Sequence, residues 1–158
     1  MDIVKIPRME KKEYDSLIEE GYVSRIAFNG EKYPYIAPFL YVFDGKYLYF
    51  LSTKYGRKND LFRKSPHVSV EIERYSSDLS SYNFVTFQGY LVKEEDAIIK
   101  KIVRKKFVEM IGEHNLSSNI LAALGHDPSD PIDSIATEER SNIWKLIGVT
   151  DIVALKNL

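Results

Sequence analysis

Two adjacent cations, Arg57 and Lys58, stand where a short helix is expected to begin. A helix N-terminus carries a partial positive charge, so cations are unfavourable there when the helix is considered alone. A bound anion would reverse this balance, because the free backbone N–H groups of a helix N-terminus readily accept phosphate. Two hydroxyl side chains, Ser52 and Thr53, precede the cations and can donate further hydrogen bonds. The pattern predicts a site for a phosphate-bearing ligand.

Other catalytic chemistry finds little support in the sequence. The chain has no Cys, which excludes disulfides, thiolate nucleophiles and Cys-bound zinc. Its three His residues, His67, His114 and His126, do not stand at metal-ligand spacing, and no G-x-S-x-G motif or nucleotide-binding glycine loop is found. A redox cofactor would carry the chemistry itself, so a missing acid–base motif is compatible with cofactor chemistry. We assign no catalytic residue and no metal site from the sequence.

The composition predicts a globular protein rich in β-structure. Of its 158 residues, 44% are hydrophobic and 13% aromatic, and aromatic side chains favour strands and flat apolar walls. The formal net charge of -1 does not support bulk attraction to nucleic acid or to an anionic membrane. No secretory signal and no apolar run of about 20 residues is visible, so we expect a cytoplasmic protein that forms one domain over residues 1–158.

Several segments have the pattern of strands, and tight turns connect some of them. Asn29-Gly30 and Asp44-Gly45 are short-range hairpin signals. Strands joined by hairpins, with few helices inserted, predict an antiparallel sheet or barrel. The expected strands are residues 22–28, 34–43, 46–52, 67–73 and 84–92, followed by one or two strands within 142–155.

Four helices and one long loop are expected between and beside these strands. The helices are residues 10–21, 58–65, 94–113 and 117–125, and the irregular loop is residues 126–141. The longest helix has an apolar stripe at helical spacing, formed by Ile99, Val103, Phe107, Met110 and Ile111. Its basic side chains are assigned to a solvated face, formed by Lys100, Lys101, Arg104 and Lys105.

The expected strand at 34–43 is apolar on both of its faces. One face holds Tyr35, Ala37, Phe39, Tyr41 and Phe43, and the other holds Ile36, Pro38, Leu40 and Val42. Both faces should be covered, one by a barrel interior and the other by a partner subunit, a flat ligand, or both. Pro38 cannot donate a ladder hydrogen bond, so it predicts an edge or a bulge with free backbone groups. Together with the cations, this strand predicts a site for a flat conjugated ring that carries a phosphate.

The order of these motifs resembles the FMN-binding split-barrel proteins, which are relatives of pyridoxamine 5'-phosphate oxidase. The similarity is strongest to the branch that includes the nitroimidazole-resistance proteins. It covers about residues 9–92 and, more loosely, the end Trp144-Lys145-Leu146. The elements that carry it are the P-Y-x-x-P strand, the D-G turn, the Y-F-x-S strand end, the G-R-K loop and the run NDLFRKSPHVSV.

The resemblance implies a mainly β fold, a six-stranded antiparallel split barrel with flanking helices. It also implies a homodimer with two FMN molecules at the dimer interface. Arg57 and Lys58 would hold the phosphate with help from Ser52 and Thr53, and Phe84 would contact the flavin from the second subunit. The full set of implied cofactor contacts is Pro38, Phe39, Leu40, Tyr41, Ser52, Thr53, Arg57, Lys58, Phe84 and Trp144.

Three positions depart from the pattern of the family. Leu51 stands where many nitroimidazole-resistance relatives carry a His, so a mechanism that uses this His does not transfer. Ile36 and Tyr41 stand where the true oxidases carry Arg and Lys, and the C-terminal segment lacks their Arg and His pattern. Oxidation of vitamin B6 is therefore not expected.

The resemblance leads us to expect an FMN-dependent oxidoreductase, a reductase or an oxidase, that acts on an unidentified small molecule. NAD(P)H is a candidate electron donor, and nitroaromatic or quinone-like compounds are candidate acceptors. Three alternatives stay open: a split barrel that uses haem or a deazaflavin, a flavin-binding protein without catalysis, and a barrel that binds nucleic acid or protein. The net charge of -1 argues against nucleic acid.

Overall fold

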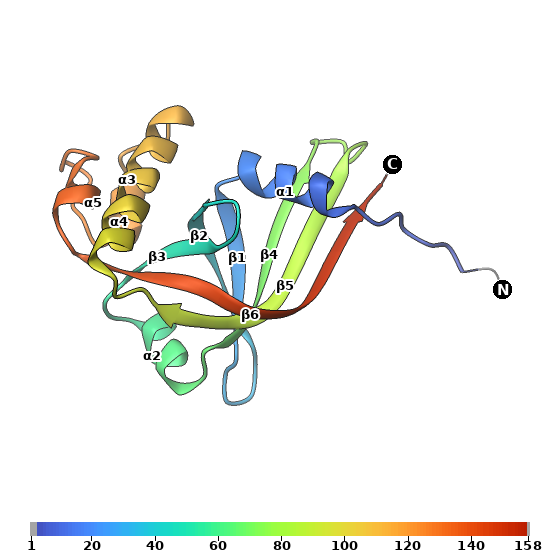
Figure 1. The fold of residues 1–158 in the computed structure, drawn as a ribbon, viewed down its shortest axis with the longest axis horizontal. Helices are drawn as coiled ribbons and strands as arrows, with labels where there is room; N and C mark the ends of the chain where they lie inside the picture. Colours follow the sequence, from blue (N-terminus) through green and yellow to red (C-terminus); the bar gives the residue numbers. More distant parts are fainter. Residues whose placement is uncertain (1–2, 158) are drawn as a thin grey trace.

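The computed structural model describes residues 3–157. Its strands are β1 (Val23–Phe28), β2 (Tyr35–Phe43), β3 (Leu48–Thr53), β4 (His67–Tyr75), β5 (Tyr82–Lys93) and β6 (Ser141–Lys156). They form a closed antiparallel barrel in the order β1-β2-β3-β6-β5-β4 (Figure 1). The predicted fold class, a mainly β six-stranded barrel with flanking helices, is confirmed.

The helices lie at the ends and on the outside of this barrel. They are α1 (Lys11–Glu20), α2 (Arg57–Lys64), α3 (Ala97–Glu113), α4 (Ile120–Ala123) and α5 (Ser134–Thr137). Figure 1 shows α3, α4 and α5 grouped on one side of the molecule, away from α1. Among residues 3–157, no helix is long and apolar enough to cross a membrane.

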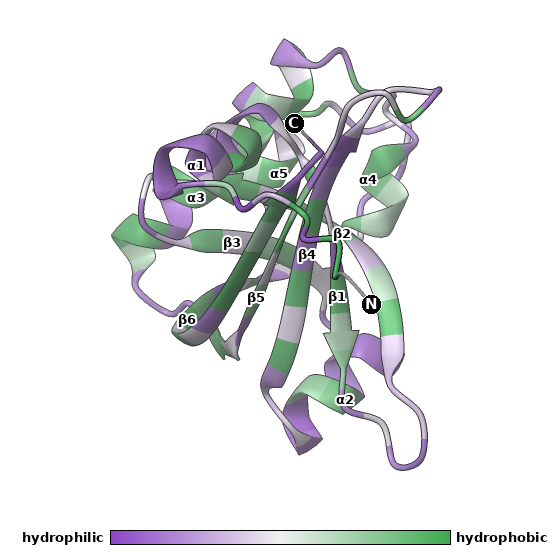
Figure 2. Ribbon diagram, turned by 90° about the vertical axis from the view of Figure 1, so that its right-hand side faces the viewer, coloured by the Kyte–Doolittle hydropathy of each residue, from purple (hydrophilic) through white to green (hydrophobic). Residues whose placement is uncertain are grey.

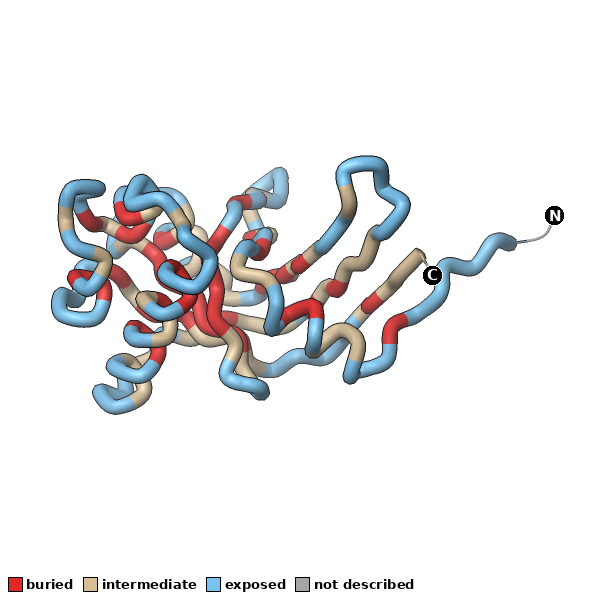
Figure 3. Tube along the Cα trace, turned by 90° about the horizontal axis from the view of Figure 1, so that it is seen from above, coloured by how far each residue is buried: buried red, intermediate tan, exposed pale blue. Residues whose placement is uncertain are grey.

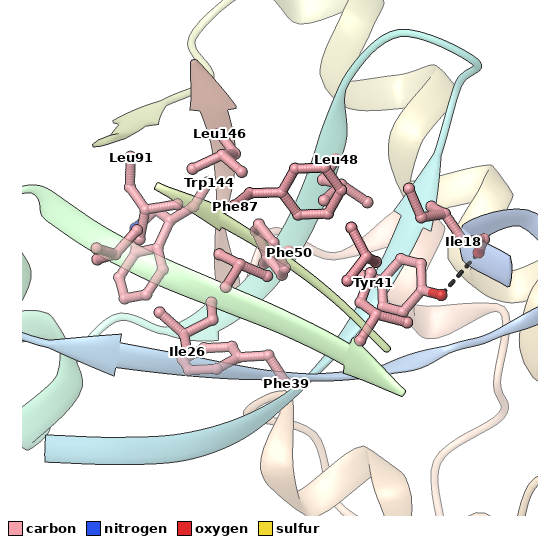
Figure 4. Close-up of a cluster of buried hydrophobic side chains, with 14 of the residues drawn as sticks. Ile18, Ile26, Phe39, Tyr41, Leu48, Phe50, Phe87, Leu91, Trp144 and Leu146 are labelled. Carbon is pink, nitrogen blue, oxygen red and sulfur yellow. Dashed lines mark hydrogen bonds between the residues drawn. The ribbon is translucent and has the colours of Figure 1, made fainter. Parts of the chain in front are cut away.

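The apolar side chains form two separate clusters, one inside the barrel and one outside it. The interior cluster includes Phe39, Phe50 and Trp144, and Figure 4 shows these rings packed between the strands. The outer cluster joins α3, α4 and α5 to the outer face of β2 and β3. Alternation along the strands sends side chains to opposite sides of the sheet, as the hydropathy along β4 in Figure 2 shows.

Figure 3 shows that the chain is buried mainly in the strands and in the helix faces that pack on them. The segment before α1, residues 3–8, is exposed. Leu17 and Ile18 of α1 belong to the interior cluster, so α1 contributes to the barrel core.

The pairing of β2 differs between its two halves. Residues 35–40 pair with β1 alone. Residues 41–43 pair with β3 instead, and this ladder stops at Tyr41 opposite Phe50. The barrel therefore splits between β2 and β3, and the first half of β2 has one free edge within the described chain.

Hydrogen-bond alternation shows which backbone groups face this free edge. The Tyr41 N–H donates to the Tyr22 carbonyl oxygen at 3.0 Å, so Tyr41 turns its backbone toward β1. In an antiparallel ladder, alternate residues turn their backbone groups the opposite way. Ile36, Pro38 and Leu40 therefore direct theirs away from β1. Pro38 lies at a strand edge, as predicted, and its missing N–H removes no ladder bond.

β1 and β2 pair as an antiparallel hairpin, as the Asn29-Gly30 signal predicted, but their connection is longer than a two-residue turn. It is a loop of residues 29–34. A Cβ on Gly30 would lie 2.0 Å from the Tyr33 carbonyl oxygen, so the loop folds back on itself at this glycine. The Asn29 amide donates to Ser65 Oγ at 3.2 Å and to the His67 carbonyl oxygen at 3.3 Å. These long-range bonds replace the local turn that Asn-Gly favours.

Two further predictions about the helices were wrong. The predicted irregular loop at 126–141 contains the short helix α5. Arg104 was assigned to a solvated face, but it is only 3% exposed, and its guanidinium donates to Ser141 Oγ at 3.0 Å and to the Ser141 carbonyl oxygen at 2.7 Å. Arg104 precedes the buried Phe107 by one helical turn, so it shares the buried stripe of α3.

Candidate functional site

The two cations of the predicted phosphate site open α2 and lie against aromatic side chains of β2. The guanidinium carbon of Arg57 lies 4.8 Å from the centre of the Tyr35 ring, and Lys58 Nζ lies 4.7 Å from the centre of the Phe39 ring. Gly56 precedes them at the N-cap with φ 99°, a conformation that favours glycine. Cation–π contacts hold both charges beside the free edge of β2 and leave their N–H donors available.

Neither cation has a carboxylate partner in the part of the chain that the structure describes. The ion pairs found among residues 3–157 include neither Arg57 nor Lys58. The first N–H groups of α2 also have no intrahelical acceptor, as at any helix start. We call the start of α2, with Arg57 and Lys58 and the rings of Tyr35 and Phe39, the phosphate corner. An anion at this corner would therefore meet two cationic side chains and free backbone N–H groups.

The two hydroxyl residues at the end of β3 support the loop that carries the cations. The Ser52 hydroxyl donates to the Thr53 carbonyl oxygen at 3.2 Å, and the Thr53 hydroxyl donates to the Tyr55 carbonyl oxygen at 2.8 Å. The buried Asn59 amide donates to the Lys54 carbonyl oxygen at 2.9 Å. These bonds fix residues 54–56 and bring the start of α2 beside the end of β3.

The free edge of β2 adds polar backbone groups next to the cations. Ile36 presents an N–H and a carbonyl oxygen to this edge, and Pro38 presents a carbonyl oxygen. The Ile36 side chain is 64% exposed on the outer face of the barrel, and Pro38 is exposed as well. A flat ring with donors and acceptors along one side matches such a strand edge, because an extended backbone offers both kinds of group.

Phe39 and Trp144 form the wall behind this edge. Lys58 Nζ lies over the Phe39 ring. The centre of the same ring lies 5.6 Å from the centre of the Trp144 ring. Phe62 of α2 lies 4.8 Å from the same indole. Trp144 is fully buried, and its Nε1–H has no hydrogen-bond acceptor within residues 3–157. The structure therefore places Trp144 inside the barrel, where it supports the wall from behind.

The remaining predicted site residues do not join this corner through their side chains. Leu40 packs in the outer cluster with α3, so only its backbone faces the edge. The Tyr41 ring is inside the barrel, and its hydroxyl donates to the Ile18 carbonyl oxygen at 2.7 Å (Figure 4). Burial raises the pKa of the Tyr41 phenol above its usual range. Phe84 lies on β5, and β1 and β4 separate it from β2 in the barrel.

Tyr35 is the residue that sequence reasoning missed. It was assigned only to an apolar strand face, whereas its ring is the surface on which Arg57 lies. The signal was present, because Tyr35 and Phe39 are aromatic residues four positions apart on the same face of one strand. Only the fold shows that the start of α2 passes over both.

This geometry can be compared with known proteins. Residues 10–131 match the family described as pyridoxamine 5'-phosphate oxidase. An uncharacterized protein of Rhizobium meliloti (strain 1021) is 33% identical over 70 residues, which are 44% of this chain and 46% of that protein. The matched segment thus spans less than half of the length of that curated relative.

Many solved structures share the fold, among them the following three. An FAD-binding protein from Mesorhizobium loti has a TM-score of 0.69 and 17% identity, over 96% of each chain. HutZ, the heme storage protein of Vibrio cholerae, has a TM-score of 0.67 and 15% identity, over 92% of this chain and 94% of that chain. A candidate 5-nitroimidazole antibiotic resistance protein from Bacteroides thetaiotaomicron has a TM-score of 0.61 and 16% identity, over 96% of this chain and 90% of that chain. Similarity at these identities shows the fold alone, and it confirms the split-barrel resemblance.

Proposed function

Because this chain belongs to the pyridoxamine 5'-phosphate oxidase family, we propose that it binds a flavin nucleotide and acts as an oxidoreductase on a small molecule. FMN is the smallest flavin that would bring a phosphate to Arg57 and Lys58. The observation that carries the proposal is the placement of Arg57 and Lys58 on the faces of Tyr35 and Phe39. There the two cations lie beside the free edge of β2 without a carboxylate partner among the described residues.

Each part of the corner has a role toward a flavin. Arg57 and Lys58 would bind the phosphate, and each charge-assisted hydrogen bond contributes about 1.5–3 kcal/mol. The backbone of Ile36, Pro38 and Leu40 would meet the polar side of the isoalloxazine ring. Phe39, supported by Trp144, would exclude water from the wall behind the strand. The bound flavin would supply the electron-transfer chemistry itself.

A second copy of the chain would complete this site. The outer face of β1 and β2 exposes the apolar side chains of Val23, Ile36 and Pro38, with Arg25 opposite Pro38 and paired with Glu73. An apolar patch beside a free strand edge favours a protein contact. Phe84 of the partner subunit is the expected contribution from across the interface. Sedimentation should give twice the mass of one chain, and a monomer that still binds FMN would contradict the placement of the flavin at an interface.

Haem is a second candidate ligand, favoured by one specific observation. His67 is exposed at the start of β4 and lines a hollow of about 530 Å³ together with Phe28 and Tyr90. Its ring lies 5.7 Å from that of Tyr90. An imidazole beside aromatic walls can ligate haem iron, and HutZ, which shares the fold, is described as a heme storage protein.

The absorption spectrum of the purified protein, followed by titration with FMN, tests these proposals. Bands near about 370 and 450 nm that stay with the protein would support flavin. One intense band near about 400 nm, lost on His67→Ala, would support haem. A colourless protein that ignores added FMN would contradict the flavin proposal.

Anaerobic addition of NADH or NADPH then tests catalysis. Bleaching of the flavin bands by a donor, and their return with an added acceptor, would support the oxidoreductase. A flavin that neither nucleotide reduces would exclude NADH and NADPH as donors, and would leave an oxidase of another substrate or a binding protein without turnover.

A further inference from the structure

A hollow of about 410 Å³ lies next to the phosphate corner and shares Arg57 with it. One wall is the loop of residues 29–34, and the other is one face of α2. The helix positions on this face are Arg57, Asp60, Leu61 and Lys64, which follow helical spacing. The proposed flavin contacts use only the Arg57 end of this space.

The hollow is pre-formed because its loop is fixed at its base. The Asn29 amide bonds to Ser65 and His67, the residues just after α2, so the loop and the helix cannot separate freely. The close contact between Gly30 and the Tyr33 carbonyl oxygen fixes the fold-back of the loop. A site that exists before binding loses less free energy to the ordering of its walls.

The walls of this hollow carry the groups that recognise a nucleotide. Tyr33 is 72% exposed, and Lys32 Nζ lies 5.4 Å from the centre of its ring, so a base that stacks on this ring must displace Lys32 or use the other face. Lys32 and Lys64 add two cations to Arg57, and Lys64 has only an exposed pairing with Glu31, at 3.6 Å. Exposed pairs of this kind contribute little, so a phosphate can displace the carboxylate. The Glu31 carboxylate can then accept a hydrogen bond from an exocyclic amine.

Arg57 connects the two sites. Its guanidinium lies over Tyr35 at the start of α2, beside Lys58, and it also lines the hollow. A phosphate bound by Arg57 would therefore stand at the mouth of the hollow. A ligand with one phosphate would end there, whereas a dinucleotide would continue into the hollow with a second phosphate, a ribose and a base.

We propose that the hollow binds the adenylyl half of a flavin dinucleotide, so that the chain prefers FAD to FMN. This inference rests on the proposed flavin function and specifies its cofactor. Tyr33 stacks on the adenine ring, and Lys32 and Lys64 bind the second phosphate. A nicotinamide dinucleotide also carries an adenylyl group, and the experiment below separates the two sources.

The test is the ratio of FAD to FMN affinity, measured with the full-length protein by quenching of flavin fluorescence. We expect FAD to bind about tenfold more tightly or better, which is the scale of one stacking contact with a base. Tyr33→Ala should bring the FAD affinity close to that of FMN and leave FMN binding unchanged. Lys64→Ala should have a smaller effect in the same direction. Tyr75→Ala, which removes another exposed tyrosine outside the hollow, is the matched control and should change neither affinity.

Each other outcome overturns the inference. Equal affinities for FAD and FMN, or a ratio that Tyr33→Ala leaves unchanged, would exclude the adenylyl site and leave the flavin function intact. Tyr33→Ala that raises the KM for NADH in the FMN-loaded protein, without any FAD preference, would assign the hollow to the donor. Binding of neither flavin would overturn both the inference and the proposed function.

Discussion

In β2, apolar side chains alternate along residues 35–43, but residues 35–40 pair with β1 alone and residues 41–43 pair with β3. Their outer faces differ as well. Leu40 and Val42 are buried under the α3–α5 cluster, whereas Ile36 and Pro38 are exposed. The outer face of one strand thus changes from exposed at Ile36 and Pro38 to buried at Leu40 and Val42.

This difference shows that apolar pattern and coverage are separate properties. The sequence marks both halves of β2 as apolar on two faces, and such strands are normally buried on both. The chain itself covers the outer face at Leu40 and Val42 with helices. The first half is left beside the cations of α2, so we propose that a flavin and a partner subunit cover it.

The largest effect that separates the covered outer positions of β2 from its exposed ones is expected from Leu40→Ala. Leu40 is buried among side chains of α3, so its truncation should cost about 2–5 kcal/mol of unfolding free energy. Its contribution to the free edge comes from the backbone, so FMN affinity should stay the same. Urea denaturation and FMN titration of the same variant measure both quantities. Intact stability with weakened FMN binding would place the Leu40 side chain in the site and contradict the assignment.

A smaller effect is expected from pH, and it concerns the helices that cover the outer face of β2 at Leu40 and Val42. His126 is buried between these helices, and its Nδ1 lies 3.0 Å from Ser134 Oγ. Burial, and then the charge of Arg140, lower the pKa of His126 from 6.5. Above pH 6.5 this imidazole is neutral in both states and has no effect on stability. Below pH 6.5 the unfolded chain binds a proton that the folded chain excludes, so stability falls until the lowered folded-state pKa is reached.

Denaturation of the wild type and of His126→Gln at pH 7.5 and pH 5.5 measures this effect. The wild type should lose more stability between the two pH values than the variant, because Gln does not titrate. Equal losses would show that His126 does not link the helical cover to pH.

The smallest effect on stability is expected from Ile36→Ala. The Ile36 side chain is 64% exposed in one chain, so the unfolding free energy of the protomer should change by no more than about 0.5 kcal/mol. The same change should weaken the proposed dimer, because it removes apolar area from the interface. Sedimentation over a range of concentrations measures this. A loss of stability as large as that of Leu40→Ala, in a protein that stays monomeric throughout, would remove the contrast between the covered and the exposed outer positions.

Much of the fold could be predicted because local signals and tertiary structure agree in it. The strands, the long helix and the edge position of Pro38 follow from alternation, helical spacing and the missing N–H of proline. The Asn29-Gly30 signal predicted the hairpin of β1 and β2 but not the length of its loop, because Asn29 bonds to residues far along the chain and no local pattern reports such partners. The prediction of a solvated Arg104 was wrong for a similar reason, since the distant Ser141 supplies the acceptors that allow its burial.

The candidate site was only partly predictable. Arg57 and Lys58 are cations at a helix N-terminus, where a positive charge is unfavourable, and this predicted a bound anion. The structure places both beside the free edge of β2. Two features depend on how α2 packs against the loop of residues 29–34: the contact of Arg57 with the Tyr35 ring, and the hollow that Tyr33 lines. That packing joins segments distant in sequence, so neither spacing nor composition could reveal it.

The most direct test of the central claim compares FMN with riboflavin, which lacks the phosphate. In a variant with Arg57→Ala and Lys58→Ala, FMN affinity should fall about 100-fold or more, since two charge-assisted contacts are lost. Riboflavin affinity should stay the same, and a control with Lys101→Ala and Lys105→Ala, two exposed cations of α3, should bind both ligands normally. An equal loss for FMN and riboflavin would contradict the claim that this corner binds a phosphate.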